Sequence, residues 1–143
     1  MSLIFFRDLF GVHVVVTSMM VGIIWLIQLV HYPMMSGLDQ ANFKFWHEFH
    51  SRHISYIVAP LMVFELGASL VTAGNKFNFT NGLILALTSS VWLSTFALSV
   101  PIHNQLGAIG FNGNLLAKLV KTNWPRTALY TLKIAFMISV LIR

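Results

Sequence analysis

Long runs without charged residues constrain the fold of this chain more than any other feature. The stretch from Leu9 to Leu38 contains no Asp, Glu, Lys or Arg. About 20 consecutive apolar residues in a helix are enough to cross the hydrocarbon core of a bilayer. Three more runs of this kind follow, and the charges within them are Glu65, Lys133 and, near the start of the last run, Arg126. Since the runs lack the period-two alternation of membrane barrel strands, they predict helices.

We therefore expect an all-α fold, a four-transmembrane-helix bundle in one domain over residues 1–143. The predicted spans are residues 10–32, 53–72, 81–102 and 124–142. The composition agrees, because 57% of the residues are hydrophobic and only 9% are charged, against about a quarter charged in soluble domains. The lipid bilayer is the predicted partner, and the apolar run near the N-terminus is expected to be a retained anchor.

Composition also excludes several kinds of chemistry. The chain has no cysteine, which rules out disulfides, thiolate nucleophiles, cysteine-ligated zinc and iron–sulfur clusters. Its net charge of +5 does not indicate a nucleic-acid partner, because the Lys and Arg residues flank the apolar runs, as they do in membrane proteins.

The segments between the predicted spans differ in character. Residues 39–52 mix aromatic residues with Lys, His, Glu and Arg, which predicts a short interfacial amphipathic helix running into the second span. Residues 105–123 contain three glycines and are expected to form the longest connection. Pro125 is expected in the first turn of the fourth span, where proline is common.

Alternating spans gather most of the histidines at one end of the bundle. The ends of spans one and three and the starts of spans two and four lie at this end. We call it the histidine-rich end. It receives five of the six histidines and three further polar residues: His31, His47, His50, His53, His103, Asn104, Asn123 and Arg126. Only His13 is expected at the opposite end. Five Lys and Arg residues flank the histidine-rich end and three flank the other, which favours a cytoplasmic histidine-rich end.

The histidine series predicts a metal or haem site. Residues three apart on a helix are neighbours, so His50 can share a metal with His47 or with His53, but the rotation per step keeps all three from converging. His31 and His103 can complete the site from other helices. Imidazole suits copper, iron and zinc, and facing histidines in membrane bundles also hold haem. The alternative is that these histidines are amphipathic side chains at headgroup level.

Two charges inside the predicted spans form a second candidate group. Glu65 and Lys133 lie at depths that differ by roughly 4–5 Å at 1.5 Å per residue, within reach of each other. They either lock helices together as an ion pair or serve a proton relay or charged cavity. Arg126, Tyr130 and Lys133 share one face of the fourth span, which suits an anionic or carbonyl-bearing ligand. Arg126 alone can equally reach lipid phosphates.

Four segments carry a resemblance to known membrane proteins: QLVHYP, WHEFHSRHISYIVAPLMVFELG, VPIHNQLG and LVKTNWPRTALYTLK. Together they resemble a family of small bacterial four-span membrane proteins, which implies an integral protein of the bacterial inner membrane. The last two segments are also remotely similar to the anthrone-oxygenase-like membrane proteins, with a P-x-[HN]-x-x-L end of span three and a Trp…Arg-Thr start of span four. The corresponding residues are Pro101, His103, Leu106, Trp124, Arg126 and Thr127. That resemblance implies oxidation or oxygenation of a hydrophobic polycyclic substrate.

Two functions are weighed at this point, beside a purely structural role as an assembly factor. The first is an integral membrane oxidoreductase-like protein that holds a metal or haem through some of His31, His50, His53 and His103. In it Arg126 orients a hydrophobic small-molecule substrate, and Glu65 and Lys133 support the bundle or move a proton. The second is a non-enzymatic channel, transporter subunit or ligand-binding membrane module, as a homo-oligomer. Glu65 and Lys133 distinguish the two, because a conduit needs them to line water.

Overall fold

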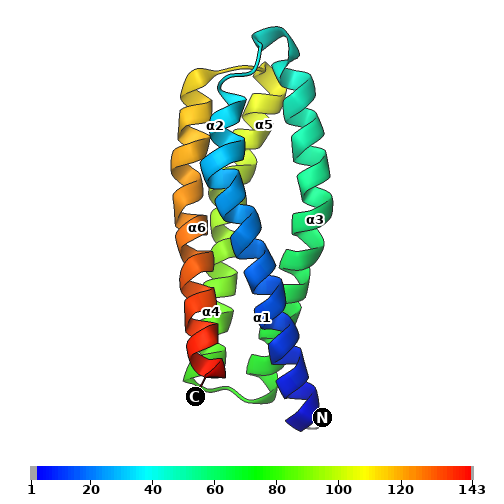
Figure 1. Cartoon of the computed structure of the whole chain (residues 1–143), viewed down its shortest axis with the longest axis vertical. Helices are drawn as coiled ribbons and strands as arrows, with labels where there is room; N and C mark the ends of the chain where they lie inside the picture. Colours follow the sequence, from blue (N-terminus) through cyan, green and yellow to red (C-terminus); the bar gives the residue numbers. More distant parts are fainter. Residues whose placement is uncertain (1–2, 143) are drawn as a thin grey trace.

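The computed structural model of the chain describes residues 3–142, and within that range it is a bundle of long helices without strands. Figure 1 shows the helical rods side by side, with both termini at the same end. The first rod consists of α1 (Leu3–Leu26), a π-helical segment η1 (Ile27–His31) and α2 (Tyr32–Met35). The second is the single helix α3 (Gln40–Asn75). The third consists of α4 (Phe79–Ser94), a second π-helical segment η2 (Thr95–Ser99) and α5 (Val100–Ile109), and the fourth is α6 (Gly113–Leu141).

Three of these rods have the length and composition of membrane spans. They are Ile4–Met35, Gln40–Asn75 and Phe79–Ile109, and they contain the first three predicted spans. The prediction of an all-α integral membrane protein with these three spans is therefore confirmed at that level. The predicted fourth span, residues 124–142, lies within α6, which is not among the three.

The bundle buries many polar side chains beside its hydrophobic core and exposes many apolar ones. Fully buried positions include Thr17, Gln28, Ser69, Thr88 and Asn123, whereas large hydrophobic side chains are exposed along every rod. A soluble protein places its side chains the other way round. Hydroxyl and amide side chains that bond across helices are typical of membrane bundles, in which lipid covers the apolar surface.

Two predictions about the connections were wrong. Residues 105–123 are not a long loop, because α5 continues to Ile109 and α6 begins at Gly113. The side chain of Asn112 caps α6 by accepting a hydrogen bond from the Leu115 amide, and Leu116 and Leu119 form a buried face. Pro125 consequently lies inside α6, not in its first turn.

The predicted interfacial helix is continuous with the second span. Residues 40–52 are the first turns of α3. Aromatic residues lie on both the buried and the exposed face of this segment. Phe43 and His47 are buried in the bundle, while Phe45, Trp46 and Phe49 are exposed. The aromatic residues on the outer face are therefore free to contact the interfacial region of a bilayer.

Each π-helical segment lies just before a proline. Pro33 follows η1 and Pro101 follows η2 by two residues. A proline lacks the amide hydrogen and its ring crowds the carbonyl four residues earlier. Here those carbonyls belong to Leu29 and Ala97, within the π segments, where the backbone bonds run from residue 32 to 27 and from residue 100 to 95. The wider turns accommodate the prolines and change the direction of the side chains that follow.

Candidate functional site

A charged group lies buried near the middle of the bundle. Lys133 Nζ is 2.7 Å from Glu65 Oε1, and the two side chains are 0% and 2% exposed. Thr17 donates a hydrogen bond of 2.7 Å to the same oxygen, and Tyr130 donates one of 3.1 Å to Oε2. The carboxylate is thus fully bonded by side chains of α1 and α6. Of the two predicted arrangements, the structure has the ion pair.

The histidines at the histidine-rich end form a cluster of four. His47 Nε2 and His103 Nδ1 are hydrogen-bonded at 3.1 Å, and the Tyr32 hydroxyl is bonded to His103 Nε2 at 2.9 Å. The rings of His31 and His50 are stacked with their centroids 3.8 Å apart. His50 and His103 face each other with centroids 6.3 Å apart. Topology thus predicted that these four histidines from three different rods lie together, but the prediction that His53 joins them as a ligand was wrong.

Two histidines lie outside this cluster. His53 is exposed, bonds the Phe49 carbonyl through Nδ1 at 2.7 Å and stacks on the ring of Phe49. Its place follows from helical geometry, because two steps of three residues from His47 turn it by about 120°. His13 is buried at the opposite half of the bundle, beside Phe64.

The cluster has no ready-made metal site among residues 3–142, where no group of three or more His, Asp or Glu side chains is arranged to hold an ion. The reason lies in the ring contacts. His47 and His103 direct nitrogens at each other, and Tyr32 occupies the second nitrogen of His103. In the His31–His50 pair the rings overlap face to face, so their nitrogens, which lie in the ring planes, do not point at a common position. A metal or haem needs several of these contacts to be replaced.

Arg126 is the third charged residue inside the bundle. It is 8% exposed, and its Nη2 donates to Oδ1 of Asn123. The Asn123 amide in turn donates to Gln28 Oε1 at 2.7 Å. These neutral amides orient the guanidinium but do not compensate its charge. The ion pairs within residues 3–142 are Arg7–Asp8 and Lys133–Glu65, and neither includes Arg126.

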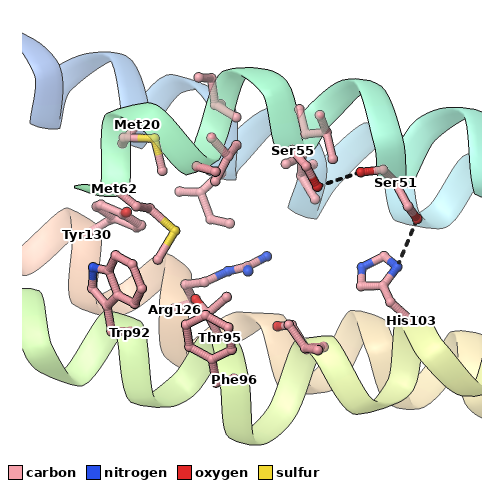
Figure 2. A pocket seen from close by; sticks show the side chains of 18 of the residues that line it. Met20, Ser51, Ser55, Met62, Trp92, Thr95, Phe96, His103, Arg126 and Tyr130 are labelled. Atoms are coloured by element: carbon pink, nitrogen blue, oxygen red, sulfur yellow. Dashed lines mark hydrogen bonds between the residues drawn. The ribbon is translucent and has the colours of Figure 1, made fainter. Parts of the chain in front are cut away.

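Arg126 borders a cavity of about 430 Å³ that lies between α3 and the η2–α5 segment. Figure 2 shows its side chain crossing the middle of this space, with Tyr130, Met62 and Trp92 on one side and His103 on the other. The cavity lining is mostly apolar, and it opens at the surface of the bundle. Its size is within the range of small-molecule sites. We call it the Arg126 cavity.

Several polar atoms in the wall of the Arg126 cavity have no hydrogen-bond partner. They are Arg126 Nε, Trp92 Nε1 and Ser99 Oγ. Buried polar groups are nearly always bonded, so each of these needs a partner that the chain does not supply. Arginine and tryptophan nitrogens only donate. Residues that line the cavity therefore carry buried donors without acceptors.

The histidine cluster forms the polar end of the same cavity. His50 and His103 line it together with Ser51. On the outer side of His103 a second, polar hollow is lined by His47, Glu48, Ser51, Arg52, His103, Asn104 and Gly107. His103 thus separates an apolar cavity from a polar surface.

Sequence reasoning found only part of this site. The predicted stripe on α6 is divided, because Arg126 and Tyr130 line the cavity whereas Lys133 is turned to Glu65. Tyr32, Trp92 and Ser99 were missed. Tyr32 could have been predicted from its position between His31 and Pro33. Nothing in the sequence around Trp92 or Ser99 indicates that they belong to the site.

No family model, curated protein or solved structure matches this chain. The resemblance to the anthrone-oxygenase-like proteins therefore stays a prediction that rests on the six residues quoted for it.

Proposed function

We propose that this chain is a four-span integral membrane protein that takes up a hydrophobic, oxygen-bearing molecule from the bilayer. The ligand occupies the Arg126 cavity, and Arg126 binds its oxygen. One observation carries this proposal: a buried guanidinium without an acidic partner borders an apolar cavity. Buried charge inside membrane helices is costly, and it marks functional sites when no structural partner explains it.

Two features support α6 as the fourth span. At 1.5 Å per residue its 29 residues extend about 43 Å, more than the thickness of the hydrocarbon core. Arg126 and Lys133 reduce its overall hydropathy, but both side chains are buried in the bundle, so that the outward surface of the helix past Lys121 is apolar or aromatic. The resemblance to small bacterial four-span proteins supports the inner membrane as the location.

Quenching of tryptophan fluorescence tests ligand binding directly. The purified protein in nanodiscs is titrated with 11-bromoundecanoic acid and, separately, with its methyl ester, because bromine quenches an indole that it contacts. We expect saturable quenching that is lost in Trp92→Phe. Ala59→Phe should block it by filling the cavity wall, whereas Ile57→Phe, on the exposed face of α3 outside the lining, should not. Absence of saturable quenching with both probes would refute the proposal.

An oxidoreductase acting on the same ligand is the second candidate, and the position of His50 and His103 in the cavity wall favours it. Neutral imidazoles can accept or donate a proton at a bound oxygen. A copper, iron or haem centre would supply the redox chemistry, with His47 and His31 as further ligands, whereas zinc at the same residues would act only as a Lewis acid.

Absorption spectra and elemental analysis of the protein purified from native membranes test this second candidate. A Soret band or stoichiometric metal that is lost in His103→Ala but kept in His53→Ala would support it, because His53 lies outside the cluster. Unchanged metal or haem content in both His50→Ala and His103→Ala would remove the ligand assignment.

A channel or transporter subunit finds less support. Its conduit would need Glu65 and Lys133 to line water, but these side chains bond each other and are at most 2% exposed.

A further inference from the structure

The charge balance around Arg126 points to the kind of ligand. Glu65 is the acidic side chain that the described part of the bundle buries, but Lys133, Thr17 and Tyr130 already bond both of its oxygens. The hydrogen-bond acceptor of the Arg126 guanidinium is neutral, because it is the side-chain amide oxygen of Asn123. The bundle interior therefore carries two cations and one anion among the side chains described here. A ligand with a negative charge removes the imbalance.

The buried donors in the cavity wall that lack acceptors also indicate an anionic ligand. Arg126 Nε and Trp92 Nε1 are donors that lack acceptors. Among the buried side-chain oxygens in the described part of the cavity wall, the one without a partner is the Ser99 hydroxyl, which can also donate. A ligand that presents acceptors suits these buried donors. Arginine binds carboxylates through two parallel hydrogen bonds, and such charge-assisted bonds are about twice as strong as neutral ones.

The rest of the cavity indicates the size and the apolar character of the rest of the ligand. Met20, Met62, Ile24 and Phe96 surround the space beyond the guanidinium. A volume of about 430 Å³ holds roughly 14 non-hydrogen atoms if each is given about 30 Å³, the share of one water molecule in the liquid. That is the size of one alkyl chain with a small headgroup. A lipid with two full acyl chains is larger than this space.

We infer that the Arg126 cavity binds a single-chain anionic amphiphile, a carboxylate of about the size of dodecanoate. Its carboxylate bonds Arg126, and its chain lies among the methionine and aromatic side chains toward Trp92. This inference rests on the proposed function, since it names the class of molecule that the same cavity takes. The anionic oxygen could also be offered by the phosphate of a membrane lipid, and the experiment separates the two sources.

The experiment compares a charged probe with an uncharged one in the same cavity. The 11-bromoundecanoate anion and its methyl ester have the same chain, so their affinities differ through the charge. In alkaline buffer and phosphatidylcholine nanodiscs we expect the anion to bind about 10- to 100-fold more tightly, the range for hydrogen bonds to charged groups. Arg126→Gln should remove this preference by weakening anion binding alone. Lys118→Gln, which removes an exposed cation from the same helix, should leave it unchanged.

The outcomes are distinct. If ester and anion bind equally well in the unmodified protein, the ligand is not selected for charge and this inference is wrong, although the proposed function stands. If neither binds, the proposed function itself fails. The comparison within the unmodified protein decides the matter even if Arg126→Gln does not fold. A tenfold loss of both anion and ester binding in phosphatidylglycerol nanodiscs would show that lipid phosphate is the preferred occupant and would overturn the carboxylate assignment, since the negative surface of this bilayer by itself weakens the binding of the anion alone.

Discussion

Removal of Lys133 should destabilise the bundle strongly, because it leaves a buried carboxylate without a counter-ion. Lys133 Nζ and Glu65 Oε1 are 2.7 Å apart, and neither side chain is more than 2% exposed. Breaking a buried ion pair by removing one partner costs about 3–5 kcal/mol. Thr17 and Tyr130 still donate to the carboxylate in Lys133→Met, so we expect a loss at the lower end, about 3 kcal/mol in the free energy of unfolding.

The double variant Glu65→Gln/Lys133→Met should recover most of that loss. The glutamine carbonyl can still accept the hydrogen bonds from Thr17 or Tyr130, and no unpaired charge remains. Replacing both members of a buried pair is often neutral. The energy of interaction between the two sites is obtained from a double-mutant cycle with the two single variants.

Unfolding by SDS in mixed micelles, followed by tryptophan fluorescence, measures these differences. Lys118→Met is the matched control, because Lys118 lies on the same helix with an exposed side chain; its expected change is within about 0.5 kcal/mol. A Lys133→Met protein as stable as Lys118→Met would refute the reasoning. So would a double variant as unstable as Lys133→Met, since the loss would then come from packing and not from the charge left behind.

Two further predictions concern the fourth rod. In the cysteine-free chain, single cysteines at Asn114 and Ile142 should be labelled from opposite sides of the membrane by an impermeant maleimide if α6 spans it; labelling from the same side would exclude the fourth span. Gln28→Leu should lower the free energy of unfolding by about 1–3 kcal/mol, because it leaves the buried Asn123 amide and the Val120 carbonyl without their partner. SDS unfolding checks this, and a stability within about 0.5 kcal/mol of the unmodified protein would count against a structural role for the amide.

The first three rods could be predicted from the sequence because a membrane leaves few alternatives. An uncharged run as long as that from Leu9 to Leu38 must satisfy its backbone hydrogen bonds internally, and a helix does so. The start of α6 could not be predicted in the same way. Lys118 and Lys121 lower the hydropathy of this segment, and the glycines before them predict a loop. In the structure Leu116 and Leu119 are buried against the other rods, and this packing stabilises the helix.

The gathering of histidines was also predictable, since it follows from the alternation of rods. Which of these histidines face inward could be predicted only in part, because that depends on the helical phase within each rod. The series on α3 favoured pairs over a triple, and the structure indeed turns His53 outward. The Arg126 cavity could not have been predicted, because four rods contribute to its wall. Its unpartnered donors, such as Trp92 Nε1, belong to residues that no sequence motif distinguishes.

The π-helical segments before Pro33 and Pro101 let each rod carry one residue more than a plain α-helix without turning the residues that follow to another face. Each absorbs that residue in a wider turn, so its loss restores an α-helix in which the residues on both sides keep their facing. Deleting Ala97 would thus remove the wide turn while leaving His103 on the same face of its rod. Among chains that share this architecture, a one-residue difference in η1 or η2 should therefore be compatible with the histidine cluster, whereas an insertion or deletion elsewhere in the same rod, which no π turn absorbs, should rotate the histidine away.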